Sequence, residues 1–426
     1  KAGSRGAEDH APVMLQGHMD MVCEKRAGVE HDFEKDGLDL IIRDGRLTAN
    51  GTTLGGDNGV AVALMLMVLD DDEIEHPPVE CVFTTEEEVG LNGAKALDKS
   101  VLKARTMINM DSEDEGVATV SCAGGLRVQF TKEIQRTTVQ GSLLTLKVEG
   151  LLGGHSGQDI DKERQNADLL MARMIQRLLK ETKGQLVSFN GGTKDNAIPR
   201  ECEASLIYES DEEAAKAEEL ACELAETYAE ELTPAEPDFS CEISCETNRT
   251  AEAIPQDAAK EFICAMRLAP NGIQKRNIKM DGFVVVSLNL GVVRTEEDRI
   301  VMIFSPRSSV ASLQEDTKER LNTLAETFGF TVSHSSEYPG WSFKEDSPVR
   351  EICKESYKEL FGEDLKIEAI HAGLECGLFS DAIKGLDAIA IGPTIANCHT
   401  PDEYLTLDSF ERFYEFLKDI LSRLAK

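Results

Sequence analysis

Several histidine and acidic residues in this sequence have the types and spacing of metal ligands. His18 and Asp20 follow the short apolar run 13–15, in the order Gly-His-Met-Asp. Residues two apart at a strand end lie on one face, so Asp20 can hold one ring nitrogen of His18 while the other nitrogen binds a metal ion. A His-x-Asp pair by itself is more often structural, so this interpretation needs further ligands.

Further acidic residues follow glycine-rich or apolar segments. Asp57 lies in Gly-Gly-Asp-Asn-Gly, which is either a tight turn capping a helix or a carboxylate at a glycine-lined bend that can bridge two ions. Glu87 and Glu88 stand beside Glu86 at the end of an apolar segment, where three adjacent like charges favour a compensating cation. Asp111 ends the next apolar segment. Each position is a weak indication when taken singly.

A second histidine far downstream completes the set. His399 lies in Asn-Cys-His-Thr-Pro, after a strongly apolar segment. A pair of zinc ions needs about four ligands per ion, of mixed nitrogen and oxygen type, with one bridging carboxylate and one open position for water. Two histidines and several carboxylates meet that need. The sequence therefore predicts a dinuclear hydrolytic metal site.

Alternating strands and helices must position these residues. Strands are expected over 13–15, 79–84 and 106–110, and a hairpin is expected around Asp44-Gly45. The helix expected over 60–69 is apolar all round, so it is buried on most sides, as in the layers of an α/β sandwich. Four apolar segments in this region end in acidic or histidine residues. This pattern places a site at the carboxyl ends of a sheet, where open α/β sheets bind ligands.

The pattern changes twice further along the chain. The first part of a catalytic domain is expected over 1–123, an inserted α+β domain on a single sheet over 124–338, and the second part of the catalytic domain over 339–426. Helices are expected over 167–181, 212–232, 309–328, 348–361 and 408–424, and strands over 143–149, 203–208, 283–290, 300–304, 330–334 and 386–391.

Composition excludes several classes of function. The 45 Lys and Arg residues stand against 78 Asp and Glu, a formal net charge of −33, and so acidic a surface repels nucleic acid and anionic membranes. The longest apolar run, 60–69, is about half of the ~20 residues that cross a bilayer. The 11 cysteines include no CxxC pair, which indicates reduced thiols and a cytoplasmic location.

Five motifs stand in a fixed order along the chain: Gln-Gly-His18-Met-Asp20, Gly-Gly-Asp57-Asn-Gly, Glu87-Glu88-Val-Gly90, Asn-Met-Asp111 and Cys-His399-Thr-Pro-Asp-Glu. In this order the chain resembles the co-catalytic zinc exopeptidases, the relatives of aminoacylase and glutamate carboxypeptidase, over essentially its whole length. Ser121-Cys-Ala-Gly-Gly125 and His371-Ala-Gly-Leu-Glu-Cys-Gly377 make the aminoacyl-histidine dipeptidase branch the most similar. The resemblance implies an α/β fold: a zinc-exopeptidase-like α/β/α catalytic domain with an inserted α+β lid and dimerisation domain. Relatives carry a helix and a strand ahead of the first motif, so we expect that Lys1 is not the natural start.

The resemblance implies a role for each residue of the metal site. Asp57 would bridge two metal ions, His18 and Asp111 would complete one ion, and Glu88 and His399 the other. The implied cofactors are two Zn²⁺ ions, and Mn²⁺ or Co²⁺ would fit the same nitrogen and oxygen ligands.

The resemblance also implies a general base. The family pattern places the catalytic glutamate directly before the ligand glutamate, which selects Glu87, and Val89-Gly90 sets this register despite the additional Glu86. The metal ions would lower the pKa of the water between them from ~16 toward ~7, and Glu87 would take its proton and deliver it to the leaving amine. Asp20 would support His18 through its second ring nitrogen.

Residues of the inserted domain are implied to complete the site. His155, in Gly-Gly-His-Ser-Gly, resembles a lid histidine that stabilises the oxyanion and usually comes from the partner subunit, so a homodimer through the lid domain is implied. Arg307 resembles a lid arginine that clamps a substrate carboxylate, and Asn196 a lid asparagine that reaches the substrate; each is alternatively an ordinary surface or turn residue. In the catalytic half, His371 and Glu375 lie in a glycine-rich loop that lines the pocket in relatives, and Glu375 can pair with the free amine of a dipeptide.

The leading hypothesis is a cytoplasmic dinuclear zinc dipeptidase that hydrolyses Xaa-His dipeptides or dipeptides of broad sequence. An N-acyl-amino-acid amidohydrolase of the same family would use the same metals and base but needs no site for a free amine. A non-catalytic metal-binding scaffold would keep the ligands without needing Glu87. The expected partners are small peptides and a second copy of the chain, with no nucleic acid and no membrane.

Overall fold

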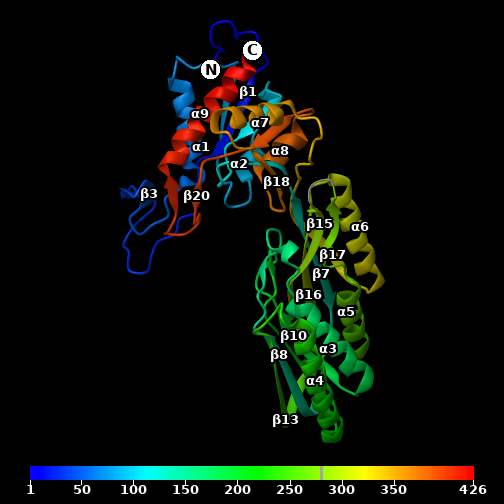
Figure 1. Cartoon of the computed structure of the whole chain (residues 1–426). Coiled ribbons are helices and arrows are strands. Elements are labelled where there is room, and N and C mark those ends of the chain that lie inside the picture. Colours follow the sequence, from blue (N-terminus) through cyan, green and yellow to red (C-terminus); the bar gives the residue numbers. More distant parts are fainter. Residues whose placement is uncertain (279–281) are drawn as a thin grey trace. The chain divides into compact units, whose positions relative to one another are not determined.

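The computed structural model of the chain describes residues 1–278 and 282–426. The chain divides into two compact units, Lys1–Ala123 together with Pro339–Lys426, and Gly124–Tyr338 (Figure 1). The first unit is therefore built from two separate lengths of chain, all of whose residues are described, whereas the second unit is one continuous segment.

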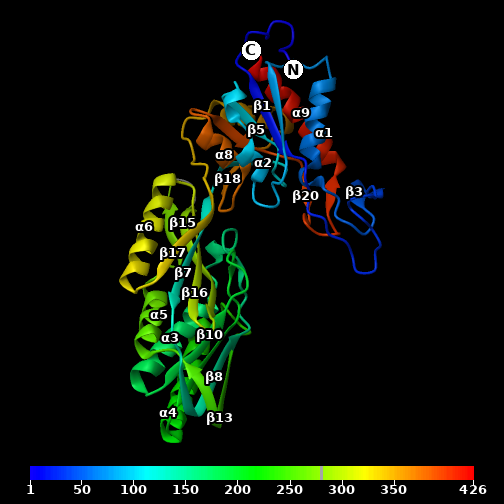
Figure 2. The ribbon, with the colours of Figure 1, turned by 180° about the vertical axis from the view of Figure 1, so that it is seen from behind.

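A six-stranded sheet forms the centre of the first unit, with the strand order β18-β6-β19-β5-β1-β4. The neighbouring strands β1 and β5 lie side by side in it (Figure 2). Every residue of β1 is buried, and β1 pairs in parallel with β4 on one side and β5 on the other. A strand that is covered on both faces needs such continuous burial, which explains its apolar sequence. The strands are β1 (Val13–His18), β4 (Val79–Thr84), β5 (Thr106–Asn109), β6 (Val117–Cys122), β18 (Lys366–Ile370) and β19 (Asp387–Ala390).

Helices pack on both faces of this sheet. On one face, Met14 of β1 shares a core cluster with Ala94 of α2 and Phe379 of α8. On the other face, α1 lies so close to β1 that a Cβ atom at Gly17 would be 2.3 Å from the Cβ of Ala61. The predicted α/β/α layering is confirmed. The helices are α1 (Gly56–Asp70), α2 (Asn92–Ala96), α7 (Pro348–Phe361), α8 (Glu375–Ala382) and α9 (Leu407–Leu424).

A four-stranded sheet, in the order β2-β3-β21-β20, flanks the loop that contains His399. Its hairpin turns at Asp44 and Gly45, whose φ angles are 52° and 74°, as the Asp-Gly pair predicts. The strands are β2 (Leu40–Arg43), β3 (Arg46–Ala49), β20 (Ile395–Ala396) and β21 (Tyr404–Thr406).

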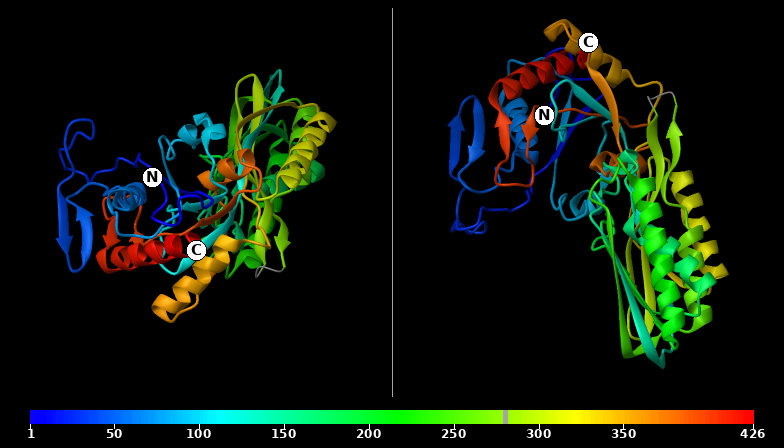
Figure 3. Two further views of the ribbon diagram at one scale, coloured as in Figure 1. Left: turned by 90° about the horizontal axis from the view of Figure 1, so that it is seen from above. Right: turned by 60° about the horizontal axis from the view of Figure 1, so that its bottom comes forward.

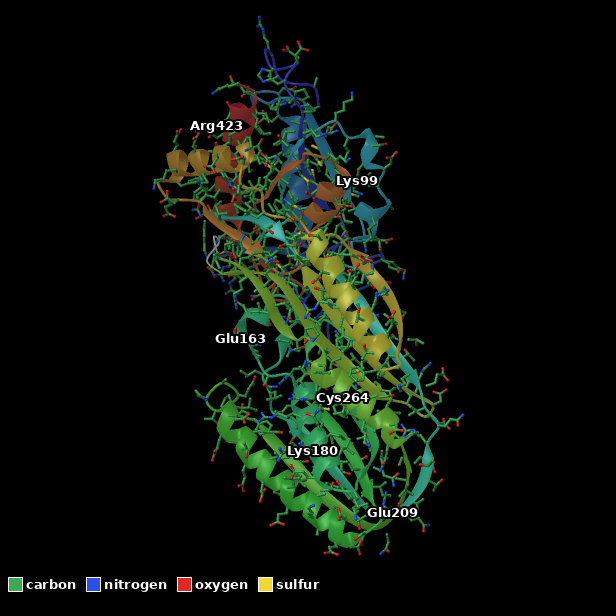
Figure 4. The ribbon with its side chains drawn as sticks, turned by 90° about the vertical axis from the view of Figure 1, so that its right-hand side faces the viewer. Lys99, Glu163, Lys180, Glu209, Cys264 and Arg423 are labelled. Atoms are coloured by element: carbon green, nitrogen blue, oxygen red, sulfur yellow. The ribbon has the colours of Figure 1, made fainter. Side chains whose placement is uncertain are left out.

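The second unit is built on one large antiparallel sheet. Its described residues form nine strands, in the order β13-β8-β12-β10-β15-β16-β7-β17, with β14 pairing β15. Four long helices contribute to one core cluster with these strands and lie on one face of the sheet (Figure 3). In Figure 4, Lys180 marks α3 and Cys264 marks α5.

The bounds of these elements follow from the hydrogen-bond ladders. The strands are β7 (Gly124–Glu133), β8 (Thr137–Glu149), β10 (Gln185–Gly191), β12 (Cys202–Tyr208), β13 (Ser240–Ala253), β14 (Gly272–Asn277), β15 (Phe283–Thr295), β16 (Arg299–Ser308) and β17 (Thr331–Tyr338). The helices are α3 (Ala167–Glu181), α4 (Asp211–Leu232), α5 (Gln256–Leu268) and α6 (Ala311–Thr327).

Sequence patterning predicts some of these elements and misses others. The helix predicted over 167–181 matches α3, and the one predicted over 348–361 matches α7. In the second unit the pattern does not predict β7, β10, β13, β14 or α5. β13 lies at the sheet edge and most of its residues are exposed or half-buried, so it lacks the apolar alternation of a strand with one buried face.

Two expectations from composition concern membranes and disulfides. Within residues 1–278 and 282–426, no helix has both the length and the apolarity needed to span a membrane. The 11 cysteines all carry free thiols.

Candidate active site

Three parallel strands of the first unit end beside one another, and a predicted ligand lies at or just after the end of each. His18 is the last residue of β1 and pairs in register with Thr84, the last residue of β4. Glu87 and Glu88 follow β4, and Asp111 follows β5. Because the carboxyl ends of parallel strands meet at one edge of a sheet, the fold gathers these side chains from distant parts of the sequence.

Asp57 lies between the two predicted histidine ligands. It interrupts the helical backbone at the start of α1, with φ −83° and ψ 104°. Its Oδ1 atom is 3.1 Å from Nε2 of His18, and its Oδ2 atom is 3.1 Å from Nε2 of His399. One carboxylate thus directs one oxygen toward each imidazole, as a ligand shared by two ions would.

Asp57 joins the predicted ligands in two clusters, and within each cluster the ligand atoms all lie within 4.8 Å of one another. The first cluster adds His18 and Asp111, with 3.5 Å between Nε2 and Oδ1. The second adds Glu88 and His399, with 3.0 Å between Oε1 and Nε2. The structure therefore brings the five predicted metal ligands together in two groups that share Asp57.

The electrostatics of these clusters fit a pair of divalent cations. Burial by itself would lower the pKa of His18, but hydrogen bonds to Asp111 and Asp57 outweigh it and raise the pKa to about 12. Hydrogen bonds to Asp57 and Glu88 raise the pKa of His399 to about 10. The carboxylates thus stabilise positive charge beside the two imidazole rings. In a metal site the rings are neutral ligands, and the metal ions carry that positive charge. Imidazole nitrogen with carboxylate oxygen is a donor set that suits zinc.

The support of His18 differs from the expected one. Nδ1 of His18 lies 2.9 Å from the main-chain oxygen of Asp20, whereas the Asp20 carboxylate is 3.6 Å away. That carboxylate instead accepts a hydrogen bond of 3.2 Å from the backbone N–H of Glu88. The carbonyl of Asp20 therefore orients the ring, and its side chain ties the His18 strand to the Glu88 turn.

Glu87 lies on a tight turn directly after β4. Its main-chain oxygen accepts hydrogen bonds from the N–H groups of Gly90 and Leu91, at 3.0 and 2.9 Å. Gly90 has a φ of 113°, which favours glycine, and this explains the Val-Gly that follows the glutamates. The half-buried Glu87 carboxylate makes no hydrogen bond or ion pair within the described residues. Burial and the negative charge of Asp111 raise its pKa to about 8.

Sequence reasoning missed the role of Glu403. This buried residue accepts hydrogen bonds from the backbone N–H groups of Leu54, Gly55 and Asp57, at 2.8, 2.9 and 3.1 Å. It therefore holds the loop that carries the shared carboxylate. Its place in the motif after His399 was visible, but a motif does not show which backbone groups a side chain binds.

Three further neighbours of the ligands were also missed. Asn58 donates a hydrogen bond of 2.7 Å from Nδ2 to Oδ1 of Asp111. Glu113 and Cys398 form another cluster of ligand-type atoms with Asp57. Asn58 and Cys398 each adjoin a predicted ligand in the sequence, and this adjacency is the signal that could have found them.

Glu375 is the first residue of α8 and is completely buried. Its Oε2 atom accepts hydrogen bonds from Gln16 and, at 2.7 Å, from Thr84, while its Oε1 atom is buried without a hydrogen bond. Burial raises the pKa of Glu375 to about 6. His371 is also buried, in the segment between β18 and α8.

In the second unit, two of the predicted residues are neighbours. His155 belongs to the short strand β9 (Gly154–His155), which pairs with β11 (Ala197–Ile198). Directly after it, the backbone N–H of Ser156 donates a hydrogen bond of 2.8 Å to the main-chain oxygen of Asn196. The structure thus brings His155 and Asn196 side by side.

The surroundings of His155 select one form of its ring. Nδ1 accepts hydrogen bonds from the backbone N–H groups of Gly157 and Gln158, at 3.3 and 3.0 Å. Burial and the positive charge of Arg307 lower the pKa of His155. The ring is therefore neutral, with its proton on Nε2, and the predicted Arg307 lies near enough to act on it electrostatically.

With this geometry in view, comparison with known proteins decides the family. The protein-family description "Peptidase family M20/M25/M40" matches residues 14–423, a span that contains all the predicted site residues. The chain belongs to peptidase family M20/M25/M40.

Individual relatives of this M20 chain are dipeptidases. It is 35% identical over 430 residues to the cytosol non-specific dipeptidase of Escherichia coli (strain K12). The aligned region covers all of this chain and 87% of the relative. Its structure matches that of aminoacylhistidine dipeptidase from Vibrio alginolyticus with a TM-score of 0.93 and 35% identity, over 99% of this chain and 86% of that one. Aminopeptidase PepT from Bacillus cereus, at 16% identity and a TM-score of 0.53, shares the fold alone.

These comparisons confirm the assignment made from the motifs. The M20 chain is a homologue of the aminoacyl-histidine dipeptidases, and it has the predicted α/β fold with a separate antiparallel unit.

Proposed function

We propose that this M20 peptidase hydrolyses dipeptides with the help of two metal ions. His18 and Asp111 would hold one ion, Glu88 and His399 the other, and Asp57 would bridge them. The observation that carries this proposal is the Asp57 carboxylate, with one oxygen 3.1 Å from each histidine. When bound, two such ions polarise a peptide carbonyl and lower the pKa of a water molecule. Zn²⁺ is the expected metal, and Mn²⁺ or Co²⁺ would suit the same ligands.

Glu87 would move the proton. Its carboxylate adjoins the ligand Glu88 and has no partner in the described residues, so it is available to a water molecule. As a general base it would accept the proton of the attacking water, and as a general acid it would return that proton to the leaving amine. Asp20 would assist by holding the His18 strand against the Glu88 turn.

Residues of the second unit would bind the substrate and stabilise the transition state. His155 would donate a hydrogen bond from its Nε2–H to the developing oxyanion, a role that its neutral form supports. Arg307 is buried and has no carboxylate partner in the described residues, which supports a role in binding the substrate carboxylate. Asn196, beside His155, would reach the same substrate. The resemblance to relatives favours a homodimer through this unit, with His155 acting across the interface.

Glu375 would recognise the amine end of the dipeptide. Its Oε1 atom lacks a hydrogen bond, and a buried carboxylate oxygen without a partner favours an ammonium group. His371 precedes it on the same segment and would line the pocket. The name of the Escherichia coli relative, a cytosol dipeptidase, and the free thiols of this chain favour a cytoplasmic enzyme.

A comparison of two substrate classes tests this proposal. We expect the metal-loaded enzyme to hydrolyse a panel of dipeptides, including Xaa-His, faster than the corresponding N-acetyl-amino acids, which lack the free amine. Faster hydrolysis of the acetylated compounds would favour the alternative, an N-acyl-amino-acid amidohydrolase. No hydrolysis of either class, by protein that metal analysis shows to be loaded, would favour a non-catalytic scaffold.

A further inference from the structure

Arg307 and Tyr338 face each other across an intervening strand. In the antiparallel sheet of the second unit, Arg307 of β16 pairs with Gly125 of β7, and Gly125 pairs on its other side with Tyr338 of β17. Directly opposite residues in such a sheet project to the same face. The backbones of Arg307 and Tyr338 are two interstrand spacings apart, about 10 Å, so their side chains meet only if nothing stands between them.

Gly125 leaves that space open. A Cβ atom at this position would lie 2.8 Å from Oη of Tyr338 and 3.0 Å from its Cζ atom. The tyrosine ring therefore lies over the glycine and occupies the volume that a side chain would fill. Gly125 has no left-handed φ angle, so close approach and not backbone conformation accounts for the glycine here.

Through this gap Tyr338 engages one edge of the guanidinium. Nη1 of Arg307 donates a hydrogen bond of 3.0 Å to Oη of Tyr338. Nε of Arg307 is buried and has no hydrogen-bond partner in the described residues. Nε and Nη2 form the other edge of the guanidinium, which is suited to binding a carboxylate with two parallel hydrogen bonds. The contact with Tyr338 thus uses Nη1 and leaves this other edge available for a ligand.

The burial of the Arg307 guanidinium favours a bound anion. Arg307 is 7% exposed, and in residues 1–278 and 282–426 no carboxylate pairs with it. A buried charge without a partner is costly, so the arrangement favours a bound anionic group.

We propose that Tyr338 is a positioning residue that holds Arg307 for the C-terminal carboxylate of the dipeptide and so sets the preference for a free carboxylate. This inference rests on the proposed function of Arg307. It adds that the orientation of the guanidinium depends on a tyrosine two strands away and on the glycine between them.

The test compares a dipeptide with the same dipeptide carrying a C-terminal amide, using the full metal-loaded chain. In Tyr338→Phe, which removes only the hydroxyl, we expect KM for the free dipeptide to rise about tenfold, since a hydrogen bond to a charged group is lost. We expect kcat to change little and the kcat/KM for the amide to stay unchanged. Gly125→Ala, which would displace the ring, should have the same effect.

A control variant and a double variant show whether the effect of Tyr338→Phe acts through Arg307. Tyr228 lies on α4, and its buried hydroxyl has no hydrogen-bond partner in the part of the chain described, so Tyr228→Phe should leave both substrates unaffected. In an Arg307→Ala background, Tyr338→Phe should add nothing further, because the two residues act as one unit.

Three outcomes would overturn the proposal. If Arg307→Ala removes the preference for the free carboxylate but Tyr338→Phe and Gly125→Ala keep it, Tyr338 does not position Arg307, although the proposed function of Arg307 stands. If Tyr338→Phe lowers kcat/KM equally for both substrates, its role is only structural. If Arg307→Ala itself keeps the preference, the assigned role of Arg307 fails and the positioning role fails with it.

Discussion

The carboxylate of Glu403 accepts a hydrogen bond from the backbone N–H of Asp57, 3.1 Å away. The same buried carboxylate also binds the N–H groups of Leu54 and Gly55. Hydrogen bonds to a charged acceptor contribute about 1.5–3 kcal/mol each. The position of the shared carboxylate between His18 and His399 thus depends on a residue that is not itself one of the proposed ligands.

Glu403→Gln should weaken metal binding. Its amide group would offer donors to backbone N–H groups that need an acceptor, so the Asp57 loop would shift. We expect metal affinity to fall about 10- to 100-fold, as for other residues that orient ligands, when measured by competition with a chelator. Asp402→Asn, at the exposed neighbouring residue, is the control and should keep the wild-type affinity. Equal affinities for both variants would contradict this role of Glu403.

A comparison of substitutions at Glu87 and Glu86 tests the assignment of Glu87 as the general base. Glu87→Gln should lower kcat about 10²- to 10⁴-fold, because the amide cannot accept the proton of the water, while metal content stays unchanged. Glu86→Gln, at the exposed preceding residue, should keep the wild-type kcat. Steady-state kinetics with metal analysis checks both variants. The reverse result would mean that the motif is shifted by one residue.

Mixing two inactive variants tests whether His155 acts across a dimer. His155→Ala and Glu87→Ala should each be inactive alone. In a random mixture, half of the dimers of a two-fold assembly contain one intact site of two, so co-expression should restore about a quarter of the wild-type activity. The absence of recovery, with mixed dimers demonstrated by differential tags, would show that His155 acts within its own subunit.

Asp168 predicts a pH dependence of stability. It is completely buried in the first turn of α3, and burial raises its pKa to about 8, although the nearby Cys202 thiol and Arg294 oppose the shift. Between about pH 4 and pH 8 the unfolded chain has released this proton while the folded chain still holds it. The free energy of unfolding should therefore fall as the pH rises, by up to about 1.4 kcal/mol per pH unit.

Asp168→Asn should remove this slope, since an amide does not titrate in that range. Urea unfolding at several pH values between 5 and 8 compares the two proteins. We expect the free energy of unfolding of the wild type to fall relative to that of the variant across this range. Parallel curves would contradict a buried, neutral Asp168.

The grouping of the proposed metal ligands was predictable because the sequence carries their positions locally. His18 ends a strand of the sheet and Glu88 and Asp111 follow two others, and parallel strands bring their ends together whatever their distance along the chain. Asp57 and His399 stand in motifs dense in glycine or proline, which mark loops. Strand ends and loop signals thus sufficed to group these residues.

The supporting contacts were not predictable in the same way. Glu403 binds backbone groups of a loop formed by another part of the chain, and Tyr338 reaches Arg307 across Gly125. Periodicity reports which face of an element is buried, but not which polar atom a side chain meets on a distant segment. For the same reason the sequence could not show that Asp20 orients His18 through its carbonyl and not its carboxylate.

The division of the first unit into two lengths of chain governs when the site can form during synthesis. His399 and Glu403 belong to the later length, whereas Asp57, which both of them contact, belongs to the earlier one. A growing chain therefore lacks two of these contacts until the ribosome has passed the whole of the second unit. That unit is continuous and can fold first, since domains fold as units while the chain emerges. The proposed metal site is therefore complete only after the later length of the first unit has been synthesised.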